Sequence, residues 1–241
     1  MSSEIVIREV TTGVWTFSKP FARFGLIPFG GRSTAVKLST GGVWVVASTP
    51  LSKETKETLD KLGPVQWIVS PDAVHHLFLD EFKTAYPEAK VIATADAIKR
   101  HGNPSLKVDG VWGKDAADAK YGFEDDIEWI YFDGFANKDV AFLHKASKTL
   151  IEADLLFNLP AKEQYSKTKS SGSFPLFKNL NPYHNFHTKF LGNLAKDKVA
   201  MKRDAQAVAN WDFDRIIPCH GDVVETGGKK AWQDVYKKIL A

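Results

Sequence analysis

The chain of 241 residues contains a single cysteine, Cys219, and therefore no intrachain disulfide. This excludes a disulfide-stabilised secreted domain, and a lone thiol fits a reducing compartment. Long apolar runs are also lacking, and none approaches the roughly 20 residues that a membrane span needs. The first ten residues carry Glu4, Arg8 and Glu9 and no apolar segment typical of a secretory signal. We therefore expect a soluble, cytoplasmic protein with no membrane partner.

A strong excess of charge of either sign is missing as well. The 32 Lys and Arg residues against 29 Asp and Glu residues give a net charge of +3, and the lysines are scattered. A nucleic-acid partner would require a basic block or face, so none is expected. The composition, 44% hydrophobic and 25% charged, is that of a globular protein. We expect one domain over residues 1–241 with a small-molecule substrate.

The first half of the chain alternates strand-like segments with glycine turns. Alternating or continuous apolar patterns predict strands over 13–17, 33–38, 43–47, 65–69 and 91–93. Helices are predicted over 53–62, 76–86 and 95–100, the first with Ser52 as N-cap and Gly63 as its stop. The segment 19–32 is rich in Phe, Gly and Pro, which favours an apolar loop suited to covering a site.

The second half repeats this organisation after a polar, irregular stretch over 101–126. Strands are predicted over 127–132, 139–144, 149–154 and 215–217. The segment 160–182, rich in Ser, Lys, Gly and Pro, is typical of a mobile loop or lid. Helices are predicted over 185–210 and 229–240. Two strand-rich halves, each followed by helix, indicate an α/β protein.

Side chains able to bind a metal stand at the carboxyl ends of three apolar strands. His75 and His76 follow the strand at 65–69, Asp154 ends another, and His220 follows a third. Sites in α/β sheets form where loops leave the strand ends. Imidazole nitrogen and carboxylate oxygen suit borderline cations. The pattern indicates a metal site, in which at most one of the adjacent histidines is well placed unless the backbone turns there.

Each of these residues also has a structural interpretation. Asp154 can cap the segment that follows it, and His220 can belong to a turn with the next glycine. A histidine after an apolar strand is often a hydrogen-bonded structural residue. We expect such a role for His101 and His144, and we interpret Cys219 as a small buried residue.

Two further groups are candidates for contact with a substrate. His184 and His187 lie three residues apart, next to the expected lid, which favours a surface or substrate-contact role over metal binding. Phe21, Phe24 and Phe29 belong to the apolar loop and either line a substrate pocket or belong to the core.

Blocks in a characteristic order run through most of the chain. They are STAVKL from Ser33, GVWVVASTP from Gly42, GPVQWIV from Gly63, HHLF from His75, AYPEAK from Ala85, KTLIEADL from Lys148 and IPCHG from Ile217. In these blocks the chain resembles the metallo-β-lactamase superfamily and, within it, the DUF4336 type. The resemblance implies a four-layer αββα sandwich with one or two metal ions at the sheet edges.

The family's metal motif, His-x-His-x-Asp-His, is only partly present. Its first two histidines fall on Pro71 and Ala73, its aspartate falls on His75, and only its last histidine matches, at His76. The next family histidine follows a glycine, where this chain has Phe135. The resemblance therefore implies that the ligands of one of the two metals are missing.

The ligands of the other metal are largely retained. Asp154 matches the family's bridging aspartate and His220 its last histidine, so the implied set is His76, Asp154 and His220. His75 is a possible fourth ligand in place of the missing carboxylate. Such a set suits one divalent ion, zinc first and also iron or manganese.

An open position on that ion would generate a nucleophilic metal-bound water near neutral pH. The expected function is thus a metal-dependent hydrolase acting on a small ester, lactone or amide, with Asp72 or Asp222 orienting or deprotonating the water. Two alternatives stay open: a non-catalytic binding protein that kept the fold, and a mononuclear iron redox enzyme.

Overall fold

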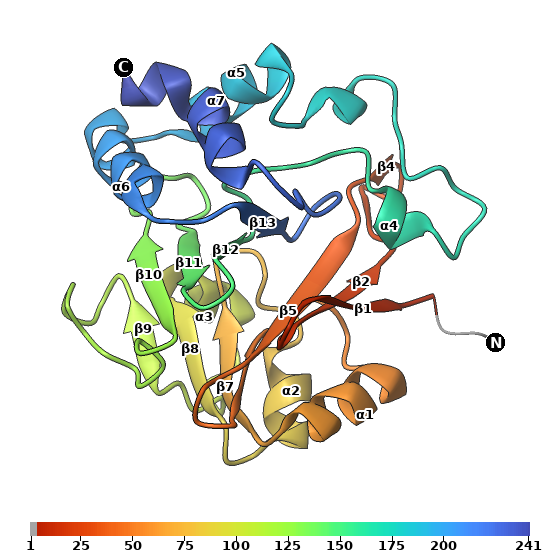
Figure 1. Cartoon of the computed structure of the whole chain (residues 1–241). Coiled ribbons are helices and arrows are strands. Elements are labelled where there is room, and N and C mark those ends of the chain that lie inside the picture. The colour runs from red at the N-terminus through yellow and green to blue at the C-terminus, as the bar shows by residue number, and fades with distance from the viewer. Residues whose placement is uncertain (1–3) are drawn as a thin grey trace.

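Two β-sheets pack face to face in the computed structural model, which describes residues 4–241 (Figure 1). In spatial order the larger sheet contains β1 (Val6–Thr11), β2 (Val14–Lys19), β5 (Gly31–Lys37), β6 (Val43–Val46), β7 (Val65–Ser70), β8 (Lys90–Thr94) and β9 (Gly110–Trp112). The smaller sheet contains β10 (Ile127–Tyr131), β11 (Val140–His144), β12 (Thr149–Glu152) and β13 (Arg215–Pro218). The pairs within β6–β9 and the pair β12–β13 are parallel. Residues 1–3 of the expected domain lie outside the described residues.

The side chains of β6 point alternately into two hydrophobic cores, one on each face of the larger sheet. Trp44 and Val46 point into the core between the two sheets, where the Trp44 ring lies 4.9 Å from that of Phe142 on β11. Val43 and Val45 point the other way, into the core beneath the helices of the larger sheet. A strand buried on both faces needs the continuous apolar run seen in the sequence. Helix, sheet, sheet and helix follow one another, so the αββα expectation is confirmed.

The helices that follow the strands of the larger sheet are α1 (Lys53–Leu62), α2 (Leu79–Ala85) and α3 (Ala95–His101). Ser52 caps α1 by accepting a hydrogen bond from the Thr55 amide at 3.1 Å, as predicted. Leu59 of α1 and Phe82 of α2 are fully buried against the sheet. These short helices hold the strand ends in place.

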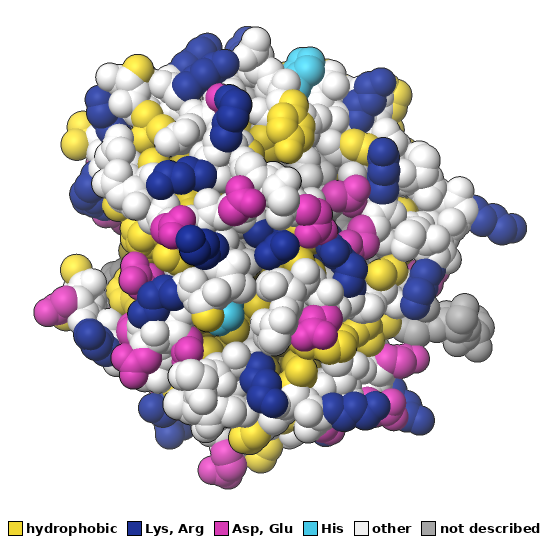
Figure 2. Space-filling view, viewed as in Figure 1, with side chains coloured by type: hydrophobic (Ala, Val, Ile, Leu, Met, Phe, Trp, Pro, Cys, Tyr) yellow, Lys and Arg dark blue, Asp and Glu magenta, His cyan; other side chains and the backbone are white. Residues whose placement is uncertain are grey.

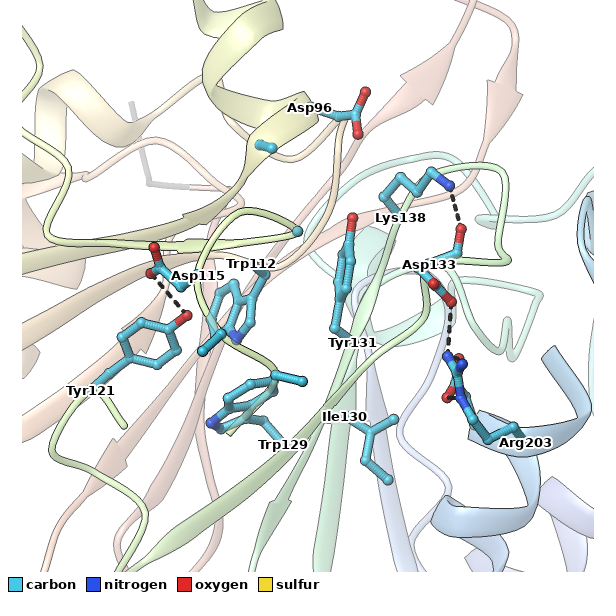
Figure 3. A pocket seen from close by; sticks show the side chains of 15 residues that line it. Asp96, Trp112, Asp115, Tyr121, Trp129, Ile130, Tyr131, Asp133, Lys138 and Arg203 are labelled. Atoms are coloured by element: carbon cyan, nitrogen blue, oxygen red, sulfur yellow. Dashed lines mark hydrogen bonds and ion pairs between the residues drawn. The ribbon is translucent and has the colours of Figure 1, made fainter. Parts of the chain in front are cut away.

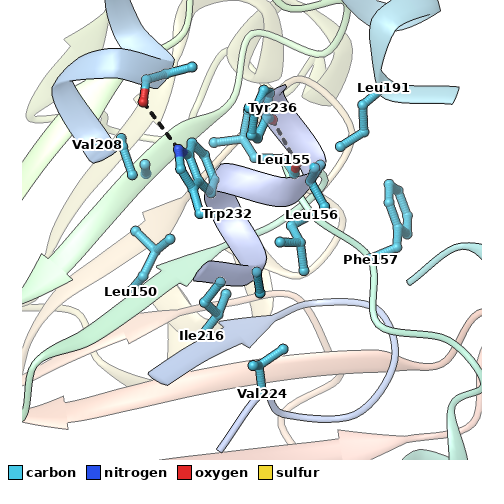
Figure 4. Packing of buried hydrophobic residues seen from close by; sticks show 14 of the residues in the cluster. Leu150, Leu155, Leu156, Phe157, Leu191, Val208, Ile216, Val224, Trp232 and Tyr236 are labelled. Carbon is cyan, nitrogen blue, oxygen red and sulfur yellow. Dashed lines mark hydrogen bonds between the residues drawn. The ribbon is translucent and has the colours of Figure 1, made fainter. Parts of the chain in front are cut away.

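The smaller sheet is covered by α5 (Asn185–Leu194), α6 (Lys198–Asn210) and α7 (Gly228–Leu240). Figure 4 shows Trp232 and Tyr236 of α7 at the centre of this core. Trp232 Nε1 donates to the Ala205 carbonyl at 3.1 Å, and the Tyr236 hydroxyl donates to the Leu155 carbonyl at 2.7 Å. The second bond ties the outer helix to the segment just beyond β12, which carries Asp154.

The prediction of one helix over 185–210 is wrong, because α5 and α6 are separate. Asp197 ends the run by accepting hydrogen bonds from the amides of Val199 and Ala200, which makes it the N-cap of a new helix. The helix expected over 76–86 begins only at Leu79. Before it, Asp72 accepts hydrogen bonds from the Val74 and His75 amides and turns the chain.

Two strands of the larger sheet were missed, and so were a small hairpin and two short helices inside the expected loops. β1 pairs with β2 at the edge of the larger sheet, and β9 lies inside the stretch expected to be irregular. The loop 19–32 contains a small hairpin, β3 (Ala22–Arg23) and β4 (Ile27–Pro28). The segment 160–182 contains α4 (Lys162–Tyr165) and a 3-10 helix, η1 (Phe177–Asn179). Gln164 of α4 is fully buried, which anchors this segment to the body of the domain.

Acidic and basic side chains are interspersed on the face seen in Figure 2 rather than gathered by sign. This agrees with the small net charge of +3. Within residues 4–241, no helix combines the length and the hydropathy that crossing a membrane requires.

Candidate metal centre

The structure brings His75, Asp154 and His220 together. One donor atom from each of the three side chains lies within 4.8 Å of the other two. His75 follows β7 of the larger sheet, whereas Asp154 and His220 follow the adjacent strands β12 and β13 of the smaller sheet. The group therefore forms where the carboxyl ends of strands from both sheets meet.

The distances within this group are those of donors around one ion. His75 Nε2 lies 3.2 Å from His220 Nε2, and His220 Nε2 lies 3.3 Å from Asp154 Oδ1. Two nitrogens each 2.0–2.1 Å from one tetrahedral ion stand about 3.3 Å apart. The distances from His220 Nε2 to the other two donor atoms thus already match the spacing that a tetrahedral cation imposes.

Hydrogen bonds on the far side of each ring fix the two tautomers. His220 Nδ1 lies 2.6 Å from the Gly30 carbonyl, which can only accept, so the proton sits on Nδ1. His75 Nδ1 lies 2.9 Å from Asp72 Oδ1, and that carboxylate likewise places the proton on Nδ1. Both Nε2 atoms consequently face the same small space and are the atoms that can bind a cation. Carbonyl and carboxylate partners of this kind are common behind metal-binding histidines.

The hydrogen-bond partners of Asp154 show whether the group can hold a cation. Asp154 Oδ1 is buried and accepts no hydrogen bond from the residues that the structure describes. Asp154 Oδ2 accepts from Asn137 Nδ2 at 2.5 Å, which orients the carboxylate. A buried carboxylate oxygen without a hydrogen-bond partner is costly unless a cation satisfies it, and the two Nε2 atoms beside it can bind the same cation. The donors present therefore fit one divalent ion.

Further carboxylates surround the group. Asp72, Asp139 and Glu152 are each at most 1% exposed. Burial raises the pKa of Asp139 and of Glu152 well above the ordinary value, and neighbouring carboxylates add to the effect on Asp139. Asp139 Oδ2 accepts from the Asp154 amide at 2.6 Å, which positions the backbone of the candidate ligand. A cation at the centre would stabilise the ionised forms of these carboxylates.

The titration of the group reflects the same charges. Burial would lower the pKa of His75, but the charge and hydrogen bond of Asp72 raise it to about 9. Burial would raise the pKa of Asp154, but the adjacent His220 ring and the charge of His75 hold it below its usual value. Asp154 therefore stays ionised, as a metal ligand must.

A buried arginine holds the loop that carries His220. Arg32 is fully buried, and its Nη1 donates to the carbonyls of Pro218 at 2.6 Å and Gly221 at 2.7 Å, on either side of His220. Its Nη2 pairs with Glu163 Oε1 at 3.2 Å. Gly221 has φ +88°, and a Cβ there would lie 2.2 Å from the Asn158 carbonyl oxygen, so only glycine fits.

An apolar cavity of about 290 Å³ opens onto Asp154 and His220. Its wall is mostly aromatic and aliphatic, formed by Phe21, Phe24, Ile27, Phe29, Phe157, Phe177, Phe190 and Leu194. The His220 ring stacks on that of Phe157 at 5.6 Å with an angle of 3° between their planes. The loop 19–32 thus covers the site, with Arg23 as the one cation among the described lining residues.

The structure separates the two adjacent histidines. His75 joins the group, whereas His76 packs its ring 5.6 Å from that of His101 and is no part of the group. The set implied by the family motif therefore changes from His76 to His75. The physical cause is the turn at Asp72, which directs the first of the two side chains to the strand ends.

Neither proposed acid–base residue lies in the apolar cavity. Asp72 stands behind His75 as its hydrogen-bond partner, and Asp222 accepts from the Glu163 amide at 2.8 Å. Both carboxylates hold other parts of the chain in position. Cys219 is buried, as expected, and burial raises the pKa of its thiol well above the usual value.

Of the residues Phe24, His184 and His187, which were expected to contact a substrate, only Phe24 lines the cavity. Phe24 lines the cavity and is 86% exposed. His184 instead caps α5 by accepting from the Phe186 amide. His187 is fully buried, and its Nε2 accepts from the Phe157 amide at 3.1 Å, so it supports the cavity wall from behind.

Asn137 and Arg32 were missed by the sequence analysis. Asn137 lies in an irregular connection between β10 and β11, where no pattern links it to Asp154. Arg32 stands at the start of a strand, where the sequence alone suggests an exposed charged side chain. Only the positions of distant carbonyls show what its guanidinium does.

Solved structures with the same architecture are metallo-β-lactamases. The enzyme from Hirschia baltica has a TM-score of 0.61 at 13% identity over 98% of both chains. FIM-1 from Pseudomonas aeruginosa, in its mono-zinc form, has 0.62 at 15% identity over 99% of this chain and 98% of its own. The enzyme from Erythrobacter litoralis has 0.65 at 15% identity over 99% and 97%. Such low identities establish the fold alone.

Comparison at the sequence level gives the family. No curated protein matches the sequence. A family model described as a domain of unknown function, DUF4336, matches residues 12–179, which is more than half of the chain and includes His75 and Asp154. The protein therefore belongs to the DUF4336 family and has the metallo-β-lactamase fold.

Proposed function

We propose that the protein is a hydrolase with one divalent metal ion, held by His75, Asp154 and His220. The observation that carries the proposal is the position of two histidine Nε2 atoms, 3.2 Å apart, beside a buried carboxylate oxygen that has no hydrogen-bond partner. Two nitrogens and one oxygen favour zinc, with iron or manganese as alternatives. A set of three protein ligands leaves a position open, which is the pattern of catalytic rather than structural sites.

A divalent ion in this position would polarise a substrate carbonyl and lower the pKa of a water molecule. The chain's own residues prepare the site for this chemistry. Asp72 and the Gly30 carbonyl keep protons on the Nδ1 atoms, so both Nε2 atoms are free to bind. Asn137 holds Asp154 Oδ2, which leaves Oδ1 directed at the histidines.

The cavity argues for a small, largely apolar substrate. Its volume of about 290 Å³ is at the small end of ligand sites, and the aromatic wall excludes water from the reacting groups. An ester, a lactone or an amide with an apolar acyl group fits such a wall. Arg23, whose guanidinium lies 5.4 Å from the Phe24 ring centre, stands at the rim and would favour an anionic group at the distal end of the substrate.

The test is hydrolysis of a panel of substrates by protein purified without chelator. The panel contains p-nitrophenyl acetate, p-nitrophenyl butyrate, a γ-lactone and an anilide. We expect turnover of at least one of them, favouring the longer acyl chain, and loss of that turnover in Asp154→Asn. The matched control is Asp222→Asn, which changes a half-buried carboxylate outside the cavity and leaves turnover intact. Stoichiometric metal without turnover of any substrate would contradict the hydrolase and favour a binding protein.

A further inference from the structure

A second and larger cavity, of about 810 Å³, lies between the edge strands of the two sheets (Figure 3). It is bounded by the start of α3, by β9 and the turn after it, by β10 and by α6. Among the described residues, none lines both this cavity and the one at the metal centre. A binding site here would therefore be separate from the proposed metal centre.

One wall of this cavity is a block of aromatic rings. The Trp112 and Trp129 rings lie 5.8 Å apart in an edge-to-face arrangement, and Tyr131 stands beside them (Figure 3). Trp112 is almost fully buried, whereas Trp129 and Tyr131 are half-buried and keep part of their rings accessible. At Gly113 the φ angle is +87°, and a Cβ would lie 2.9 Å from the Tyr131 hydroxyl oxygen. The backbone thus passes close over the tip of the ring and fixes it.

The charges that line the cavity are mainly acidic. Four aspartates face one lysine and one arginine, in a chain whose net charge is +3. Both cations are engaged: Arg203 pairs with Asp204 at 2.7 Å and Asp133 at 2.9 Å, and Lys138 donates to the Asp133 carbonyl. An anionic ligand would have to displace these contacts.

Asp96 is the carboxylate without a partner. It accepts no hydrogen bond and forms no ion pair with the residues that the structure describes. Figure 3 shows the Tyr131 hydroxyl pointing to the side of the cavity where Asp96 lies. Burial, together with the charges of Asp96 and Asp133, raises the pKa of Tyr131 to about 12. The hydroxyl therefore stays protonated on the side of the cavity where Asp96 lies.

We propose that this cavity binds an organic ammonium ion, with its alkyl groups against Trp129 and Tyr131 and its charge facing Asp96. Ring faces attract a cation through their quadrupole, and the attraction grows as the cation loses water. Asp96 supplies the full negative charge that a neutral aromatic cavity lacks. A neutral ligand of the same shape would gain the contact with the rings but not the attraction of the carboxylate.

The first test compares two probes on the full-length wild-type protein by isothermal titration calorimetry at low ionic strength. Choline carries a quaternary ammonium, and 3,3-dimethylbutan-1-ol is its uncharged isostere. We expect choline to bind at least about tenfold more tightly than the isostere. Equal affinity for both probes, or no binding of choline at millimolar concentration, would overturn the proposal. This comparison depends on no variant.

Substitutions then locate the site. Asp96→Asn and Trp129→Leu are each expected to weaken choline binding by about tenfold. Asp118→Asn is the matched control, since it removes the same charge from an exposed residue of the neighbouring loop that does not line the cavity. It is expected to leave the affinity unchanged. An equal loss in Asp96→Asn and Asp118→Asn would show a general charge effect and would refute a site at Asp96.

Discussion

His75 Nε2 and His220 Nε2 lie 3.2 Å apart, although one histidine follows a strand of the larger sheet and the other a strand of the smaller sheet. Each ring is held from behind by a separate acceptor, Asp72 Oδ1 for His75 and the Gly30 carbonyl for His220. The distance between the two rings is therefore set by the packing of the sheets. A cation at this point would join the two halves of the domain.

The contact behind His75 predicts an effect on metal affinity. Asp72→Asn keeps the shape of the side chain but removes the charge that raises the basicity of the ring. Changes in this position behind a metal ligand cost about 10–100-fold in affinity, and we expect a loss in that range. Competition with a chromophoric chelator measures it. Asp222→Asn is the control and should bind metal like the wild type, so an equal loss in both variants would argue against the role of Asp72.

Arg32 and Arg8 share Glu163 as a partner but differ in burial. Arg32→Met leaves the Pro218 and Gly221 carbonyls without their donor and Glu163 without a buried cation. We expect a loss of about 3–5 kcal/mol in the free energy of unfolding, the usual cost of breaking a buried pair. Arg8→Met removes two partly exposed ion pairs, with Glu163 and Glu225, and should cost less, since each such pair contributes about 0–1 kcal/mol. Urea unfolding compares the two, and similar values would contradict the assigned role of Arg32.

The burial of His187 predicts a dependence of stability on pH. Burial lowers the pKa of His187 to about 3, against about 6.5 in the unfolded chain. Between these values the unfolded chain binds a proton that the folded chain excludes, so stability falls as the pH falls. From pH 7 to pH 5 this group contributes a loss of about 2 kcal/mol.

His187→Gln provides the comparison for this pH effect. Its amide oxygen can still accept from the Phe157 amide, but the side chain does not titrate. In urea unfolding at pH 7 and pH 5, the variant should lose less stability than the wild type. The same loss in both proteins would show that His187 is not the group responsible.

Phe24 tests the apolar cavity. A substrate that buries about 40 Å² of this ring gains about 1 kcal/mol, so Phe24→Ala should raise KM for an apolar ester by about fivefold. Metal content and thermal stability should stay unchanged, because Phe24 is 86% exposed. Val199→Ala, at an 81% exposed residue of α6 outside the cavity, is the control. If KM stayed unchanged in Phe24→Ala, or rose equally in Val199→Ala, the result would contradict the role of the cavity.

Much of the fold could be predicted from the sequence because local patterns specify it. The continuous apolar run of β6 predicts a strand buried on both faces, and Ser52 predicts the start of α1. The structure contains both. The break between α5 and α6 could also have been seen, since Asp197 is a strong N-cap, but the apolar spacing hid it. β1 sits at a sheet edge and is only partly buried, so its pattern was weak.

The candidate site was predictable in composition but not in detail. Strand ends located Asp154 and His220, whereas the choice between His75 and His76 depended on a turn made by Asp72. Alignment with the family motif favoured His76 over His75, because the alignment presumes that the backbone follows the same path as in a chain with the complete motif. Asn137 and Arg32 act through contacts 17 or more residues away in the chain, which no local pattern records.

Metal content in three proteins tests the central claim most directly. Wild type, His75→Ala and His76→Ala are purified without chelator and their metal is quantified by elemental analysis. We predict about one equivalent of a divalent metal in the wild type and in His76→Ala, and less than about a tenth in His75→Ala. Less than about a tenth of an equivalent in the wild type, or a loss in His76→Ala with retention in His75→Ala, would contradict the account.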